Sequence, residues 1–198
     1  MQKISVCLIS FLFIFQSSLF AYSSNPKSFI DELVKDAITK LSDKNLTKEQ
    51  KASFIEKVAT ENVDINALGL YTLGELRKSS SQDEISKYQK SFTQYFLKSL
   101  TSRLTDYSES EFEILGEDKK SANYTIINSK ISPNDGGPEI KIDWRVYTKN
   151  PEKPLIRDLI VEGLSLARTQ KEEFASILSA NNDNINVLFE KLEEFINQ

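Results

Sequence analysis

Residues 139–166 read EIKIDWRVYTKNPEKPLIRDLIVEGLSL, and the fold that we expect for the whole chain depends on them. Apolar and polar residues alternate over positions 140–147, and this period of two is typical of a strand buried on one face. The apolar members of the alternation are Ile140, Ile142, Trp144 and Val146. We therefore expect a half-buried strand here.

The second half of the same stretch predicts a partner strand. Pro151 and Pro154 indicate a turn, and residues 155–162 carry apolar side chains on both faces, which favours a strand covered on both sides. Arg157 interrupts the alternation. Gly163 then marks the end of the strand, a bulge, or a close approach of another group to the backbone. After it the apolar spacing becomes helical, so the hairpin leads into a closing helix.

Part of this stretch resembles a known family. Trp144-Arg145 lies on the first strand, residues 157–165 read RDLIVEGLS, and Arg168 and Glu173-Phe174 follow. This combination of residues at these spacings is similar to that of the MlaC family, also called the toluene-tolerance auxiliary family. At the positions where the family carries valines, this chain has Leu159, Val161 and Leu164, so that Leu159 and Leu164 are conservative departures. A short family helix is matched approximately by Asp64, Leu68, Gly69 and Tyr71.

The resemblance extends over most of residues 25–196 and implies both a fold and a function. Members of the family have an NTF2-like or cystatin-like sheet with extra helices, and they are periplasmic phospholipid carriers. The resemblance thus implies a glycerophospholipid held with its acyl tails inside and its head group near the surface. It also implies two partners, an inner-membrane ABC-type lipid transport complex and an outer-membrane complex of a lipoprotein and a porin. Shuttling between them would maintain outer-membrane lipid asymmetry.

The first 21 residues have the layout of a secretory signal peptide. Lys3 precedes an apolar run over residues 4–15, and Ala21 is a small residue at a plausible cleavage point. The run is shorter than the about 20 residues that a membrane-spanning helix needs. Cys7 is the only cysteine and lies within this segment, so no disulfide is expected in the exported chain. These features favour export to a bacterial periplasm.

The composition is that of a globular protein. With 198 residues, 39% of them hydrophobic and 27% charged, the chain is long enough for a sizeable core, and we expect a single domain over residues 22–198. The net charge of −4 is opposite to the basic footprint of a nucleic-acid-binding protein. Nucleic acid is therefore not an expected partner.

Helices are predicted before the sheet. An apolar stripe with spacings of three and four runs over residues 26–41. Capping-box sequences open the segments 47–62 and 81–104, and both segments continue at helical spacing. Between them, residues 63–74 predict a short helix that contains Gly69.

The remaining segments predict the sheet and the closing helices. Strands are expected at residues 111–115 and 121–131, joined by a hairpin turn at residues 116–119. The hairpin described first follows, and then helices over residues 168–179 and 184–196. This order predicts an α+β fold with a curved antiparallel sheet of about four strands, covered by several helices with an apolar cavity between.

The residue types exclude most familiar catalytic chemistry. The chain has no histidine, so it has no Ser-His-Asp triad, no Cys-His pair and no imidazole ligand for zinc. No glycine-rich phosphate loop or calcium loop is present, and no cofactor is expected. Asp158 and Glu162 share one strand face about 13 Å apart, beyond the about 5 to 9.5 Å of a glycosidase pair. We instead expect Asp158 to form a structural ion pair with Arg145 or Arg157, and the family resemblance favours Arg145.

What remains is a surplus of aliphatic and aromatic residues around a small sheet, and binding of an apolar ligand requires only this. The aromatic stripe of residues 81–104 either fills the core or lines a cavity. The same two alternatives apply to every candidate lipid contact. The candidates are Leu70, Leu73, Phe92, Phe96, Ile126, Ile142, Trp144, Val146, Ile160 and Leu164.

Two other functions stay open. Sheets of this kind also host small isomerases with an aspartate base and a tyrosine donor. Asp143 and Tyr147, on the polar face of the strand 140–147, are the candidates for such an isomerase or hydrolase. The third possibility is an interaction protein with a filled core. Only the carrier hypothesis predicts a stoichiometric phospholipid in the purified protein.

Overall fold

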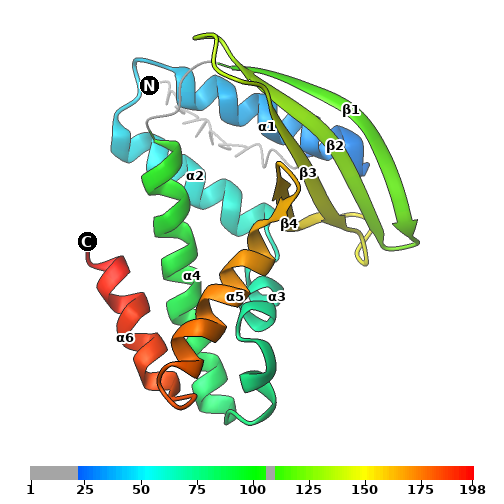
Figure 1. Ribbon diagram of the computed structural model, residues 1–198. Helices are drawn as coiled ribbons and strands as arrows, with labels where there is room; N and C mark the ends of the chain where they lie inside the picture. Colours follow the sequence, from blue (N-terminus) through cyan, green and yellow to red (C-terminus); the bar gives the residue numbers. More distant parts are fainter. Residues whose placement is uncertain (1–21, 106–109) are drawn as a thin grey trace, which may run out of the picture.

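The computed structural model describes residues 22–105 and 110–198, so the predicted signal peptide over residues 1–21 lies outside the described residues. The chain folds as helices, then a sheet, then two more helices (Figure 1). The elements are α1 (Pro26–Ser42), α2 (Lys48–Asn62), α3 (Ile65–Thr72), the 3-10 helix η1 (Gly74–Lys78), α4 (Gln82–Leu104), β1 (Ser110–Ser121), β2 (Tyr124–Pro133), β3 (Ile140–Tyr147), β4 (Leu155–Val161), β5 (Leu164–Ser165), α5 (Leu166–Ser179) and α6 (Ile185–Ile196).

Local capping signals determine where the long helices begin. The side chains of Thr47 and Ser81 each accept a hydrogen bond from the backbone N–H of the third helical residue, and the side chains of Gln50 and Glu84 each accept one from the backbone N–H of the cap residue. Both predicted capping boxes are therefore confirmed. At α1 the side chain of Asn25 accepts two backbone hydrogen bonds, ahead of a proline at the first helical position.

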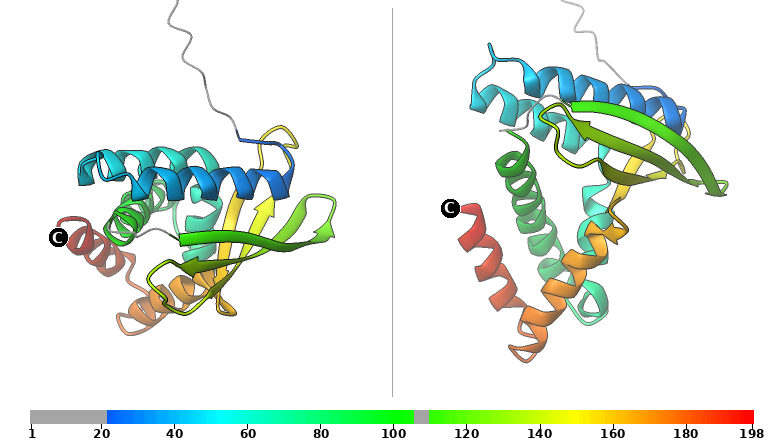
Figure 2. Two further views of the ribbon diagram at one scale, coloured as in Figure 1. Left: turned by 90° about the horizontal axis from the view of Figure 1, so that it is seen from above. Right: turned by 45° about the horizontal axis from the view of Figure 1, so that its top comes forward.

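The five strands form one antiparallel sheet in the order β1-β2-β3-β4-β5. The predicted α+β fold is confirmed, with the short β5 as an additional strand. Figure 2 shows β1 and β2 curving along their length, and α1 packs against both of them. None of the helices in the described ranges is both long enough and apolar enough to span a membrane.

The predicted hairpin turn at residues 116–119 is wrong. β1 continues through this segment to Ser121, and the chain turns at residues 122–123. A register shift between Ile114 and Gly116 accommodates one extra residue. The polar residues after Gly116 resemble a turn because they lie on an exposed edge strand, where charged side chains are common and prevent further pairing.

A register shift between β3 and β4 explains the irregular pattern of β4. Arg145 pairs with Asp158 while Val146 pairs with Ile156, so Arg157 has no direct partner on β3. This β-bulge moves the alternation by one position. Ile156 lies on the face of Val146, whereas Asp158 lies on the face of Arg145, and both side chains are buried.

Gly163 belongs to a tight turn at the end of β4. Glu162 and Gly163 have φ angles of 49° and 82° and connect Val161 to its partner Leu164. Two consecutive residues with positive φ are typical of a type I′ hairpin, where glycine is favoured. Apart from its two chain neighbours, no described residue has an atom within 4 Å of the place where a Cβ of Gly163 would stand. The strand-end interpretation is confirmed, and among the described residues no side chain or backbone approaches this glycine closely.

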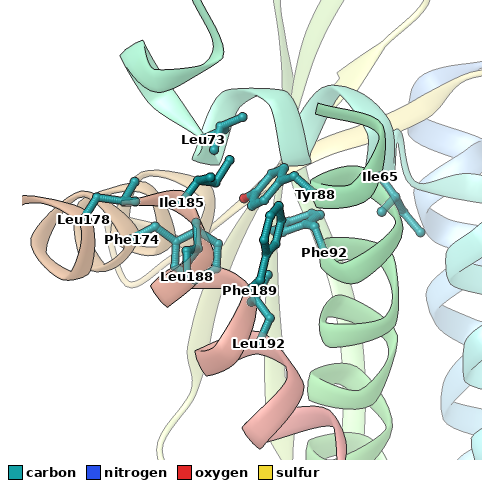
Figure 3. Close-up of a cluster of buried hydrophobic side chains, with 10 residues drawn as sticks. All are labelled: Ile65, Leu73, Tyr88, Phe92, Phe174, Leu178, Ile185, Leu188, Phe189 and Leu192. Carbon is teal, nitrogen blue, oxygen red and sulfur yellow. The ribbon is translucent and has the colours of Figure 1, made fainter. Parts of the chain in front are cut away.

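Two hydrophobic clusters form the core. The sheet cluster joins one face of the sheet to α1 and consists of Phe29, Ile30, Leu33, Val34, Ile127, Trp144, Val146 and Ile156. The helical cluster lies among α3, α4, α5 and α6 (Figure 3) and consists of Ile65, Leu73, Tyr88, Phe92, Phe174, Leu178, Ile185, Leu188, Phe189 and Leu192. The aromatic residues at the centre of α4 therefore fill a core, as one of the two alternatives predicted.

The two clusters meet at the junction of α2 and α3. Val63 packs against both and forms a parallel bridge with Ile156. The backbone N–H of Asp64 donates to the carbonyl of Ile156 at 2.9 Å. Two nitrogens of Arg157, Nε and Nη2, donate to Oδ2 of Asp64 at 2.9 Å and 2.7 Å. The start of α3 is thereby held on the edge of β4.

We predict that Gly69→Ala destabilises the fold. A Cβ at this position would lie 2.9 Å from Cδ1 of Phe92, whose ring is buried in the helical cluster. The steric clash should lower the free energy of unfolding in urea by about 1 to 3 kcal/mol. This loss outweighs the gain of up to about 1 kcal/mol that alanine brings over glycine in a helix. The control is Gly116→Ala, whose nearest contact would be 3.8 Å away. Equal stability of the two variants would contradict the close packing of α3 on α4.

Candidate functional site

A cleft with several arginines lies where α3, α5 and the strands β3 and β4 meet. It consists of two adjoining hollows of about 550 Å³ and about 350 Å³, which share Tyr71 and Arg145. Volumes of this order are typical of small-ligand sites. We call it the arginine cleft because four arginines line it. They are Arg77, Arg145, Arg157 and Arg168.

A buried carboxylate positions the central arginine. The side chain of Asp158 is 4% exposed, and its Oδ2 accepts from Nη1 of Arg145 at 3.0 Å and from the hydroxyl of Ser165 at 2.6 Å. Its Oδ1 accepts from the backbone N–H of Ala167 at 2.9 Å. The predicted pairing of Arg145 with Asp158 is confirmed. The same carboxylate holds the first turn of α5 against β4.

Arg157 is oriented by contacts that differ from those of Arg145. Its guanidinium donates to Asp64 and lies 3.5 Å from the ring centre of Tyr147. A cation this close to an aromatic face is stabilised electrostatically. Arg157 therefore lines the cleft with its charge paired to Asp64 and with Nε and Nη2 already donating.

The residues proposed for an isomerase have other partners. Asp143 accepts a hydrogen bond from Nδ2 of Asn128 at 2.8 Å, and the ring of Tyr147 carries the guanidinium of Arg157. Neither residue lines the arginine cleft. The two side chains do not converge on one reacting position, and this geometry does not favour the enzymatic alternative.

The opposite face of the sheet carries a continuous apolar surface. The strand register places six apolar side chains in two adjacent rows across β1, β2, β3 and β4. All six are only partly buried. We call them the apolar band: Phe112, Ile114, Ile131, Ile140, Ile142 and Val161.

The apolar band continues into the sheet cluster. Ser129 lies within one of its rows and is buried, with its hydroxyl donating to the carbonyl of Ile142 at 2.8 Å. The same oxygen accepts from Nε1 of Trp144 at 2.9 Å. Because its hydrogen-bonding groups are satisfied, this serine does not interrupt the apolar character of the face.

The predicted lipid contacts fall into separate places. Leu73 and Phe92 belong to the helical cluster, and Phe96 packs against it. Trp144 and Val146 belong to the sheet cluster, next to Ile142 of the apolar band. The others are Ile160 and Leu164, which line the arginine cleft, Ile126, which is on the cleft face of the sheet, and Leu70, which is half-buried on α3. Which of them touch a ligand stays a prediction.

Sequence reasoning missed several residues of the cleft. Arg77, Tyr124 and Arg168 were not candidate site residues, and neither were the side chains of α3 that line the cleft, those of Ala67, Leu68 and Tyr71. Contacts between Arg157 and Asp64 bridge 93 positions in the chain. No local pattern indicates such a pairing. Within the described ranges, no three His, Cys, Asp or Glu side chains lie together as a potential metal site.

The fold and these two surfaces define a small α+β binding protein with a polar cleft and an apolar face on one sheet. A family model described as "MlaC protein" matches residues 31–194. The chain belongs to the MlaC family.

A solved structure supports the same fold. It is that of the phospholipid-binding protein from Ralstonia solanacearum in complex with a phospholipid. The TM-score is 0.71 at 17% sequence identity, and the match covers 87% of this chain and 97% of that chain. No curated protein matches the chain.

We predict that Asp158→Asn lowers stability strongly. The substitution removes the charge that neutralises Arg145 and weakens the hydrogen bonds to Ser165 and α5. The free energy of unfolding should fall by about 2 to 3 kcal/mol, since breaking a largely buried pair leaves a charge without a partner. Glu172→Gln is the matched control, because Glu172 pairs with Arg168 on the surface. Its effect should stay within about 0.5 kcal/mol; similar losses for both would contradict the role of Asp158.

Proposed function

We propose that the protein is a periplasmic phospholipid carrier that moves glycerophospholipid between outer-membrane and inner-membrane transport complexes and so maintains outer-membrane lipid asymmetry. The observation that carries this proposal is the match of 87% of the chain to a protein described in complex with a phospholipid. Membership of the MlaC family supports it independently.

The apolar band supports the proposal from the structure itself. Side chains such as Ile142 and Val161 lie on a sheet face with part of their surface exposed. A contiguous apolar surface that is not fully buried is a common feature of ligand-binding grooves. The acyl tails of a phospholipid have the matching chemistry, and we place them against this band.

The energetics of transfer favour docking partners. A phospholipid carries about 30 methylene groups, and at about 0.8 kcal/mol each their exposure to water costs about 24 kcal/mol. This exceeds the about 18 to 21 kcal/mol at which non-covalent affinity saturates. Release of a tightly held lipid into free water is therefore too slow to be useful. Transfer has to run directly from one protein pocket to the next, with the gain in one nearly cancelling the loss from the other.

Location in the periplasm follows from the predicted signal peptide. The apolar run over residues 4–15 precedes the family match, which begins at residue 31. An exported carrier of this kind would meet both membranes of a Gram-negative cell.

We predict that phospholipid copurifies with the protein. The full chain should be isolated from its native compartment without detergent, and its organic extract analysed by mass spectrometry. Phospholipid in stoichiometric amount is expected, because exchange into water is slow. A protein that repeatedly yields no lipid, yet remains folded, would contradict the carrier.

We also predict that polar substitutions in the apolar band reduce the lipid that is retained. Ile142→Gln and Val161→Gln each place an amide on the surface assigned to the acyl tails, and the lipid per chain should fall several-fold. Ile85→Gln is the matched control, since Ile85 is a half-buried isoleucine on α4 that packs against the helical cluster and is not a candidate lipid contact. Unchanged lipid content in the two band variants, or an equal loss in the control, would show that the tails bind elsewhere.

A further inference from the structure

The arginine cleft has an excess of positive charge, whereas the whole chain has a net charge of −4. Four arginines line the cleft, and the carboxylates in its lining are those of Asp158 and Glu172. Asp158 pairs with Arg145 and Glu172 with Arg168, while Arg157 pairs with Asp64 beside the cleft. In the described part of the chain this leaves Arg77 as the arginine of the cleft without a carboxylate partner. The cleft therefore presents more cationic donors than its own acceptors can satisfy.

Arg145 is the central member of this set, and it lines both hollows. Its Nη1 donates to Asp158, while its Nε is buried with no hydrogen-bond partner among the residues that the structure describes. Its side chain is 37% exposed, so the outer part of the guanidinium is accessible. A buried donor without a partner is unfavourable in a native protein. This guanidinium is positioned by Asp158 but is not neutralised on all sides.

Two further groups in the smaller hollow can donate. Nη1 of Arg77 donates to the backbone carbonyl of Leu70 at 3.3 Å, and in the described part of the chain it forms no ion pair with a carboxylate. Tyr124 is half-buried, and burial raises the pKa of its hydroxyl above the usual value, so it keeps its proton. Arg77, Arg145 and Tyr124 therefore surround one hollow with donors.

At the N-terminus of α5, two backbone donors that face the cleft are already in use. The backbone N–H groups of Ala167 and Arg168 already donate to Asp158 and Ser165. An anion in the cleft would thus be bound by side chains. Arginine pairs especially well with phosphate, because its planar fork matches two phosphate oxygens.

We infer that the arginine cleft is a binding site for a phosphate group, carried by the head group of a phospholipid or free in solution. Arg77 and Arg145 donate to the phosphate oxygens, and Tyr124 adds a hydroxyl donor. Ile160 and Leu164 line the larger hollow and favour a phosphate that is attached to an organic group. The lipid source rests on the proposed function and requires the lipid to pass around the short edge strand β5, where Leu164 of the cleft pairs with Val161 of the apolar band. Binding of a phosphate group does not rest on the proposed function.

The test is an NMR titration of the full exported chain after removal of any copurified lipid. The probes are glycerophosphoglycerol, which is a lipid head group without tails, and inorganic phosphate. Saturable shifts of amides around the cleft are expected with at least one probe. Arg77→Gln should weaken binding about tenfold, and Tyr124→Phe about threefold. Both variants leave the buried pair of Arg145 and Asp158 intact, so they should fold.

Arg103→Gln is the matched control, because Arg103 is exposed on α4 and lies outside the cleft. Its affinity should equal that of the unchanged protein. Absence of saturable binding with both probes, or equal affinity of the Arg77→Gln variant, overturns the inference. Preference for glycerophosphoglycerol identifies a lipid head group as the source, and preference for inorganic phosphate identifies the free ion.

Failure of this inference and failure of the carrier proposal give different results. If phospholipid copurifies but the cleft variants bind the probes like the unchanged protein, the phosphate site is wrong and the carrier stands. If the probes bind in the cleft but no lipid copurifies, the carrier is wrong and the phosphate site stands.

Discussion

The buried carboxylate of Asp158 determines how the sheet meets the closing helices. It accepts hydrogen bonds from Arg145 on β3, from Ser165 at the end of β5 and from the backbone of α5. A carboxylate removed from water is costly unless each of its oxygens is paired, and here both are. The geometry of the arginine cleft follows, because the same contacts fix the guanidinium of Arg145 between its two hollows.

Because of the bulge in β4, the neighbouring residues Arg157 and Asp158 contact different parts of the structure. Arg157, left without a partner on β3, reaches Asp64 at the start of α3, whereas Asp158 pairs with Arg145. The resulting junction joins the sheet cluster to the helical cluster through Val63. One extra residue in a strand thus produces both the contact between the two halves of the core and the polar cleft beside it. The other face of the sheet packs on α1 through the sheet cluster and presents the partly buried apolar band beside it.

The sequence predicted features whose causes are local. Capping boxes at Thr47 and Ser81 and the alternation of β3 depend on neighbouring residues, and the structure confirms them. The turn expected at residues 116–119 was wrong because an exposed edge strand has the composition of a loop. The pairing of Arg145 with Asp158 was predictable because both lie on one hairpin. The cleft was not, because it needs α3 and η1, which reach β4 only through contacts distant in sequence.

The central claim is that this domain holds phospholipid tails against the apolar band, on the sheet face opposite to the arginine cleft. Methyl NMR of the protein loaded with a phospholipid that carries a nitroxide in one acyl chain tests it most directly. The account predicts strong broadening of the methyl signals of Ile114, Ile142 and Val161, and little effect at Ile85 of α4, which packs against the helical cluster. Broadening at Ile85 with sharp signals in the apolar band, or no broadening at any methyl group, would contradict it.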